Sequence, residues 1–169
     1  MSPVNPVSPA SPANLPQSPA VPEPERPSGG AVSVGIVLVS HSRALAEAAM
    51  DLARRLIVAV DVPVELAAGL ADGGLGTDPG AVVEAVERLA ERCEGVLVLA
   101  DLGSGVMSAE MALEMLDPAL AERTRLSAAP FVEGLLGAYG AAGIGKDLQA
   151  VAAEADGAAE AKRSQVAAF

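Results

Sequence analysis

The chain has 169 residues, enough for one domain with a hydrophobic core. Hydrophobic residues make up 51% of it, yet Trp is absent, Tyr occurs once and Phe twice. The core must therefore consist of Ala, Val, Leu and Ile. Such a core suits parallel strands and closely packed helices. The formal net charge of −11 argues against a nucleic-acid partner, because two polyanions repel each other, and favours a basic or mixed-charge protein partner.

The cysteine content and the hydropathy pattern indicate a compartment. The single cysteine, Cys93, cannot form an internal disulfide, which favours a reducing environment. No apolar run approaches the ~18 residues of a membrane span, and the N-terminus lacks the basic start and continuous apolar stretch of a signal peptide. We therefore expect a cytoplasmic protein with no membrane partner.

The first 31 residues differ in composition from the rest. They hold nine of the 13 prolines, with Ser, Ala and Asn between them. Most of these prolines remove a backbone donor, and the segment has few large apolar groups to bury. We predict a disordered or polyproline-II-like tail over residues 1–31, followed by one folded domain over residues 32–169.

The first half of this domain alternates apolar runs with amphipathic stretches. Val34–Val39 (VGIVLV) is a short unbroken apolar run, typical of a strand covered on both faces. Ser42–Val58 has apolar residues at helical spacing, and Val62–Ala67 predicts a second strand. A glycine-rich loop follows, and Pro79 then suits the first turn of a helix that is capped by Thr77 or Asp78 and ends near Cys93.

The second half repeats this alternation. Gly95–Ala100 (GVLVLA) predicts the third strand and Met107–Leu116 the third helix. Leu126–Ala129 predicts a short fourth strand. Helices are expected over Val132–Ala142 and Lys146–Gln165.

Strands that alternate with helices in this way predict an α/β fold with an open parallel sheet and helices on both faces. Right-handed crossovers leave few topologies for four strands, and the commonest open order is 2-1-3-4. Such sheets bind ligands where the strand order reverses, at the carboxyl ends of strands 1 and 3. The loops that meet there are Ser40–Ser42 and Asp101–Ser104.

His41, the sole histidine, falls in the first of these loops. An imidazole is largely neutral near pH 7 and is then a competent nucleophile, and phosphoryl transfer requires mainly positioning and neutralisation of the phosphoryl oxygens. Ser42 opens the first helix, so its hydroxyl and the first amides can receive a phosphoryl group. Gly103, Ser104 and Gly105 supply a second set of donors where the third helix begins.

Asp101 ends strand 3, which the predicted order places beside strand 1. Its carboxylate can accept the Nδ1 proton of His41, which leaves Nε2 free to attack. Other interpretations stay open at this point: the histidine can be structural, the aspartate a helix cap, and the loop Asp72–Thr77 a plain flexible turn. That loop lacks the GK[ST] ending of a P-loop, which disfavours nucleotide hydrolysis.

Four segments occur in this order: VSHS before a helix with LAE, DGGLGT, VLADLGSGVMSAEMALEML and AAPFVEGLLGA. The series resembles the phosphocarrier subunit of bacterial phosphoenolpyruvate-dependent dihydroxyacetone kinases, the DhaM family, which is related to mannose-type enzyme IIA domains. The similarity extends from Val32 to about Arg163 and leaves the proline-rich segment outside it. It implies that residues 32–169 form an enzyme IIA-like phosphocarrier domain.

The resemblance also implies a reaction. His41 would accept a phosphoryl group from the carrier protein HPr and pass it to ADP bound on the kinase subunit, and the resulting ATP would phosphorylate dihydroxyacetone. Asp101 would orient the histidine, while Gly103, Ser104 and Thr77 would line the phosphate pocket. The chain would need no cofactor beyond this covalent phosphohistidine, would bind no metal and would form a homodimer.

Two positions depart from the family pattern, and several alternatives remain. Gly105 stands where the family commonly has Ala, and Ser108 where it commonly has Asn. A mannose-type sugar-transport IIA domain would use the same chemistry with another acceptor, and a regulatory phosphohistidine module would signal carbon supply. A tetrapyrrole chelatase generally needs a second histidine ligand, and a histidine phosphatase an Arg-His-Gly motif and a second histidine, all of which this sequence lacks.

Overall fold

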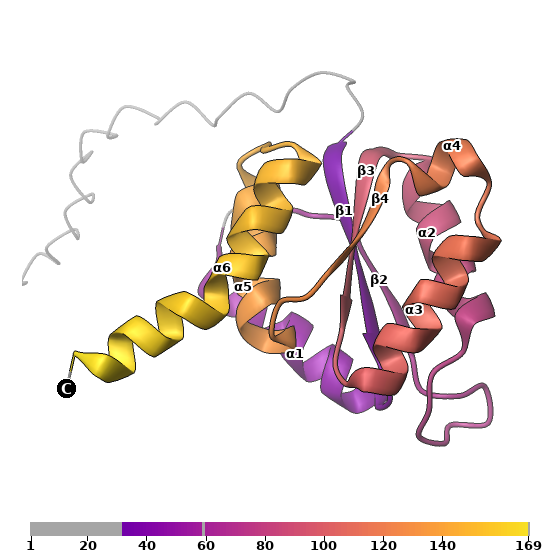
Figure 1. Ribbon diagram of the computed structural model, residues 1–169, viewed down its shortest axis with the longest axis horizontal. Coiled ribbons are helices and arrows are strands. Elements are labelled where there is room, and N and C mark those ends of the chain that lie inside the picture. Colours follow the sequence, from indigo (N-terminus) through magenta and orange to yellow (C-terminus); the bar gives the residue numbers. More distant parts are fainter. Residues whose placement is uncertain (1–31, 59, 169) are drawn as a thin grey trace, which may run out of the picture.

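Four parallel strands form one open sheet in the order β2-β1-β3-β4 (Figure 1). The computed structural model describes residues 32–58 and 60–168, so the predicted proline-rich tail lies outside the described residues. The predicted fold class, strand order and parallel direction are confirmed. The strands are β1 (Val32–Ser40), β2 (Val64–Ala68), β3 (Cys93–Ala100) and β4 (Thr124–Ser127).

Helices cover both faces of the sheet, as predicted, because alternate side chains of the buried strands point to opposite sides. Ile36 and Leu38 of β1 belong to one apolar cluster, whereas Val37 and Val39 belong to the other. The first cluster is completed by α1 (Arg43–Leu56), α5 (Phe131–Gly143) and α6 (Leu148–Ala167). The second is completed by α2 (Pro79–Ala90), α3 (Gly103–Met115) and α4 (Pro118–Ala121).

Local signals in the sequence set several of these helix starts. Asp78 precedes α2 and accepts a hydrogen bond from the Gly80 N–H at 2.9 Å, while Pro79 occupies the first helical position. Between β2 and α2 the chain turns through Gly69 and Gly73, whose φ angles of 70° and 85° are costly for residues with a Cβ. This loop therefore has a defined path at the carboxyl end of β2.

The largest differences from the sequence-based prediction occur at α3, β4 and α4. Helix α3 begins at Gly103, a turn before the predicted Met107. The sequence does not indicate this start because Gly-Ser-Gly has low helix propensity. Strand β4 spans Thr124–Ser127 rather than Leu126–Ala129, and its buried polar ends do not give an apolar run. The sequence does not predict the short helix α4 after Asp117, because its four residues have no helical periodicity.

Helix α6 is the longest helix, and its C-terminal half projects beyond the sheet (Figure 1). Lys162 of this half forms an ion pair with Glu133 at the start of α5. In the part of the chain that the structure describes, no helix combines the length and the apolarity that crossing a membrane requires.

Candidate active site

The loops after β1 and β3 lie side by side because these two strands are neighbours. Val39 pairs with Ala100, and the Asp101 N–H donates to the Val39 carbonyl at 3.1 Å. His41 and Asp101 each follow a strand directly, so both side chains stand at the carboxyl edge of the sheet. This is the edge of the sheet at which the strand order predicts a ligand site.

Asp101 holds His41 through both the ring and the backbone. The carboxylate Oδ1 lies 2.8 Å from Nδ1 of His41, and Oδ2 accepts the His41 backbone N–H at 2.9 Å. Ser40 donates its hydroxyl to Oδ2 at 2.9 Å, and the Leu102 N–H donates to Oδ1 at 2.7 Å. The predicted contact between the carboxylate and Nδ1 is therefore present, and its catalytic role stays a prediction.

The environment keeps Asp101 ionised. Its side chain is only 5% exposed, and this burial opposes ionisation, but the hydrogen bonds from the His41 backbone and ring and from Ser40 outweigh it and lower the pKa of the carboxyl. An ionised carboxylate can only accept hydrogen bonds, so Nδ1 of His41 must carry the proton. Nε2 then has the free lone pair, on a ring whose side chain is 25% exposed.

The N-terminus of α3 lies against that nitrogen. The Ser104 hydroxyl is 2.5 Å from Nε2 and, with Nδ1 protonated, must be the donor. Leu102 is the N-cap residue of α3 and has no side-chain oxygen to bind the first helical amides. No side-chain oxygen therefore caps the first amides of α3, and the role of Gly103, Ser104 and Gly105 in binding a phosphoryl group stays a prediction.

The small residue after Ser104 lets α3 approach the histidine and aspartate closely. A Cβ at Gly105 would lie 3.0 Å from Oδ1 of Asp101 and 3.8 Å from Cε1 of His41. The first distance is shorter than most Cβ contacts, so alanine at this position would require a slight shift. Glycine therefore suits this packing, although the resemblance would favour alanine here.

Thr77 supports the start of α3. Its hydroxyl lies 2.8 Å from the Ser108 hydroxyl and donates to the Ser104 carbonyl at 3.5 Å. The preceding Gly76 N–H donates to the His41 carbonyl at 2.9 Å, which fastens the loop to the histidine. Thr77 is thus brought into the site through α3. Whether it touches a phosphoryl group stays a prediction.

Ser42 is placed differently from the α3 donors. Its hydroxyl accepts the Leu45 N–H at 3.3 Å and caps α1, and its own N–H donates to the Ser40 hydroxyl at 3.2 Å. In this arrangement Ser42 stabilises the first turn of α1. Its predicted role in phosphate binding is untested.

Sequence reasoning misses two supporting hydroxyls. Ser40 is fully buried and is the last residue of β1, where a serine needs a hydrogen-bond partner; that requirement could have indicated its contact with Asp101. In the sequence Ser108 stands out only as a departure from the family pattern, whereas the structure shows it bonded to Thr77. Nothing in the local sequence pairs Ser108 with a loop 31 residues away.

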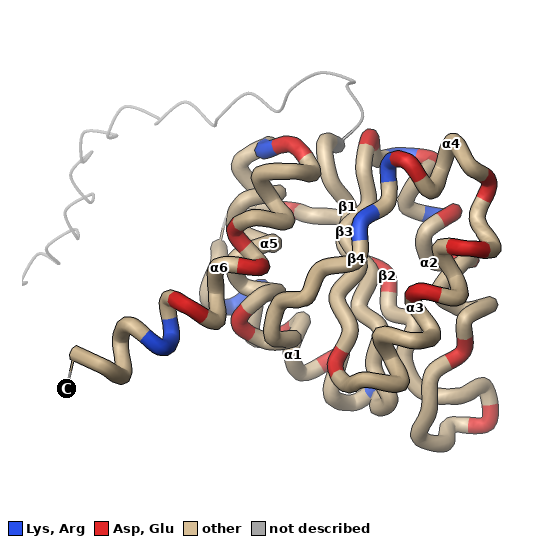
Figure 2. The backbone as a smooth tube through the Cα atoms, in the orientation of Figure 1, with Lys and Arg blue, Asp and Glu red and all other residues tan. Residues whose placement is uncertain are grey.

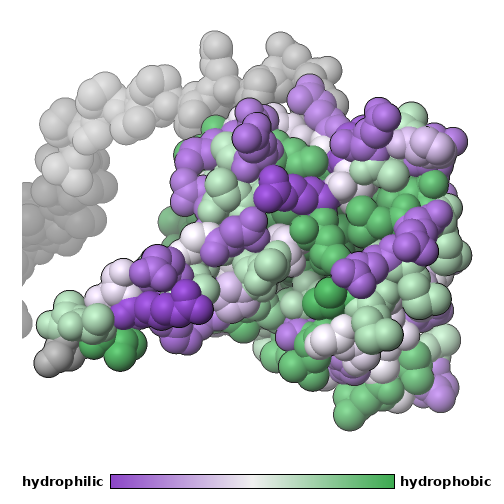
Figure 3. Space-filling view, in the orientation of Figure 1, coloured by the Kyte–Doolittle hydropathy of each residue, from purple (hydrophilic) through white to green (hydrophobic). Residues whose placement is uncertain are grey.

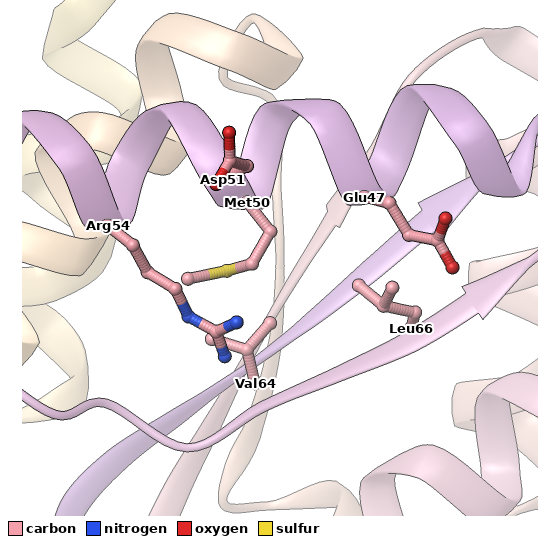
Figure 4. A pocket seen from close by; sticks show the side chains of 6 residues that line it. All are labelled: Glu47, Met50, Asp51, Arg54, Val64 and Leu66. Atoms are coloured by element: carbon pink, nitrogen blue, oxygen red, sulfur yellow. The ribbon is translucent and has the colours of Figure 1, made fainter.

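A separate hollow of about 240 Å³ lies between α1 and β2, away from His41 (Figure 4). Both carboxylates that line it are paired within their own helix, Glu47 with Arg43 at 3.1 Å and Asp51 with Arg55 at 2.7 Å. These i,i+4 pairs are exposed and typical of a solvated helix surface. The hollow is therefore a weaker candidate for a functional site than the surroundings of His41.

Comparisons with known proteins agree with this fold. The family model EIIA-man, described as "PTS system fructose IIA component", matches residues 35–152, so the chain is an enzyme IIA-type domain of the phosphotransferase system. The subunits named "PEP-dependent dihydroxyacetone kinase, phosphoryl donor subunit DhaM" from Klebsiella michiganensis and Escherichia coli K12 are each 44% identical to it over 135 residues, 79% of this chain. The chain belongs to the EIIA-man family and, within it, to the DhaM family.

The extent of these matches differs. The chain spans only 28% of the length of the Klebsiella and Escherichia subunits. A Listeria innocua protein named "PEP-dependent dihydroxyacetone kinase 2, phosphoryl donor subunit DhaM" is 36% identical over 101 residues, 60% of this chain and 79% of the relative. The solved structure of the unknown-function protein EF1359 matches with a TM-score of 0.67 and 31% identity, covering 73% of this chain and 93% of the other. The family model and the relatives named DhaM support a phosphocarrier role, and the EF1359 structure supports the fold.

Proposed function

We propose that this domain carries a phosphoryl group on Nε2 of His41, receives it from HPr and passes it to ADP held on a dihydroxyacetone kinase subunit. One observation carries the assignment: an ionised, buried carboxylate fixes the proton on Nδ1, while Nε2 faces the N-terminus of α3. A nucleophile of defined tautomer beside a set of anion-binding amides is what phosphoryl transfer requires of a protein.

In the first step the Nε2 lone pair attacks the phosphorus of the phosphohistidine on HPr. A bond forms between Nε2 and phosphorus as the bond to the donor nitrogen breaks, and the donor imidazole leaves with that electron pair. Nδ1 keeps its proton, and Asp101 offsets the positive charge of the phosphoimidazole ring. The Ser104 hydroxyl and the first amides of α3 then donate to the phosphoryl oxygens.

In the second step a terminal oxygen of ADP attacks the same phosphorus and His41 leaves as neutral imidazole. The kinase subunit as acceptor is supported by the names of the relatives, which describe phosphoryl donor subunits of dihydroxyacetone kinases. The remaining features of the proposal are a homodimer, the covalent phosphohistidine in place of a bound cofactor, and the cytoplasm as compartment. The homodimer and the covalent phosphohistidine follow from the resemblance, and the compartment follows from the single cysteine and the hydropathy pattern.

Labelling tests this function directly. Phosphoenolpyruvate, enzyme I and HPr together should add one acid-labile phosphoryl group to the chain, and none to a folded His41→Ala variant. Transfer onward to an ADP-loaded dihydroxyacetone kinase subunit would then identify the pathway. Labelling that persists in His41→Ala would refute the site. Transfer to a sugar permease instead of the kinase subunit would favour the mannose-type alternative.

A further inference from the structure

Three of the five methionines of the chain form a stripe on α3. Met107, Met111 and Met115 are 62%, 54% and 60% exposed. Their spacing of four residues places them on one side of the helix, over about 12 Å of its length. Large apolar side chains that stay this exposed in a row are a feature of contact surfaces.

The stripe begins at the candidate active site. Met107 and Met111 follow Ser104 by three and seven residues, so all three lie on the same side of α3. The Ser104 hydroxyl contacts Nε2 of His41. Leu102 and Leu75, in the loops before α3 and α2, are also exposed. A protein that exchanges a phosphoryl group with Nε2 at the start of α3 therefore comes close to Met107, one turn further along the helix.

The charged residues of α3 itself have one sign. The sequence has no Lys or Arg between Arg92 and Arg123, a stretch that contains all of α3, and none between Arg55 and Arg88. In Figure 2 the tube of α3 and of the preceding loop carries red segments and no blue ones, and Figure 3 shows hydrophobic surface interrupted by hydrophilic residues over α3. The nearest basic residue along the chain from His41 is Arg43, which is paired with Glu47.

We infer that Met107, Met111 and Met115 form the docking surface for the proteins that exchange the phosphoryl group with His41, an inference that rests on the proposed function. The occupant is a folded protein whose contact surface is apolar and edged by Lys or Arg, matching the methionines and the acidic residues Glu110 and Glu114. Donor and acceptor both have to reach Nε2, so they bind this surface in turn. Methionine suits such a surface because its flexible side chain adapts to different partners.

Charge argues against a second copy of the chain as the occupant. In a two-fold symmetric contact the same surface of both copies meets, so Glu110 and Glu114 of both copies would gather at one interface without a compensating cation from α3. A copy seated there would also cover the side of α3 that contacts Nε2. A partner whose contact surface is edged by Lys or Arg would be attracted to these glutamates, and it would leave the surface again after the transfer.

The test compares a protein donor with a small one. A Met111→Glu substitution should lower the second-order rate constant for phosphorylation by phospho-HPr at least about tenfold, since it places a charge in the middle of the contact. Phosphorylation by phosphoramidate, which needs no docking, should keep its rate. Met111→Leu should retain transfer from phospho-HPr. Leu56→Glu, at the end of α1 and 63% exposed, is the matched control and should change neither rate.

Each outcome has a distinct meaning. An unchanged rate with phospho-HPr in Met111→Glu would overturn the docking assignment, and so would an equal loss with both donors, because the substitution would then act on the site itself. Dissociation of a dimer by Met111→Glu in sedimentation would show that a second copy covers the stripe and would also overturn it. A wild-type chain that takes a phosphoryl group from neither donor would refute the carrier function instead.

Discussion

The Ser104 hydroxyl lies 2.5 Å from Nε2 of His41, the nitrogen to which we assign the phosphoryl group. Because Nδ1 carries the proton that Asp101 accepts, the hydroxyl donates to the Nε2 lone pair. That lone pair has to be free before it can attack phosphorus. The hydroxyl must therefore rotate away, and it is then close enough to donate to an oxygen of the incoming phosphoryl group.

Replacing Ser104 with alanine separates these two effects. The substitution frees Nε2 but removes a donor to the phosphoryl oxygens, and donors to developing negative charge are worth more than the release of one exposed hydrogen bond. We expect Ser104→Ala to slow phosphorylation by phospho-HPr about tenfold, and Ser104→Thr, which keeps the hydroxyl, to restore most of the rate. Rapid-quench labelling measures both. A faster Ser104→Ala variant would make the hydroxyl an inhibitor of transfer.

Asp101→Asn changes which ring nitrogen of His41 is protonated. An asparagine amide can donate to Nδ1, which moves the ring proton to Nε2 and removes the nucleophilic lone pair. We expect the phosphorylation rate to fall at least about a hundredfold while the chain stays folded. Single-turnover labelling measures the rate, and the ring tautomer can be read from nitrogen chemical shifts. An unchanged rate would remove Asp101 from the mechanism.

The same carboxylate makes stability depend on pH. The pKa of Asp101 lies below its ordinary value of 3.8, so the folded state favours the ionised form. Its contribution is complete above about pH 4 and is lost as the pH falls through the folded pKa. In urea unfolding at several pH values, the stability difference between wild type and Asp101→Asn should shrink below pH 4. A difference that stays constant there would contradict the lowered pKa.

The strand order and the meeting of the loops after β1 and β3 can be predicted because they follow from strong local patterns. The apolar run Val34–Val39 and the run Gly95–Ala100 each fill both faces of a strand, and right-handed crossovers then leave little choice of topology. His41 and Asp101 lie close together because the strands that they follow are paired. The amino-acid sequence is therefore sufficient to predict that His41 and Asp101 lie side by side.

The supporting contacts could not be predicted from local patterns. Ser108 meets Thr77 only because α3 begins at Gly103, and the low helix propensity of its first residues conceals that start. Ser42 has one hydroxyl that can cap a helix or bind a phosphoryl group, and the sequence does not choose between these uses. Which partner a hydroxyl contacts is decided by the direction of its side chain, and that direction depends on tertiary packing.

Ser42→Ala tests which of the two uses dominates. The structure shows the hydroxyl bonded to the Leu45 N–H, so its loss should lower the free energy of unfolding by about 1 kcal/mol. Ser42→Asp keeps a capping oxygen and should restore stability, but it adds a negative charge beside the phosphoryl site. A capping role predicts near-normal labelling in Ser42→Ala. Labelling lost without loss of stability would indicate a direct phosphate contact.

The hydrogen bond between Thr77 and Ser108 should connect the stability of the β2–α2 loop to that of α3. Thr77→Val and Ser108→Ala each remove one hydroxyl of a 2.8 Å contact, and the double variant should cost about 1 kcal/mol less than the sum of the two. Urea unfolding of the four proteins measures this coupling. Both single variants should also slow labelling of His41, because Ser104 lies on the turn of α3 that this contact supports. Additive costs would show that loop and helix are held independently, leaving Thr77 with no positioning role at the histidine.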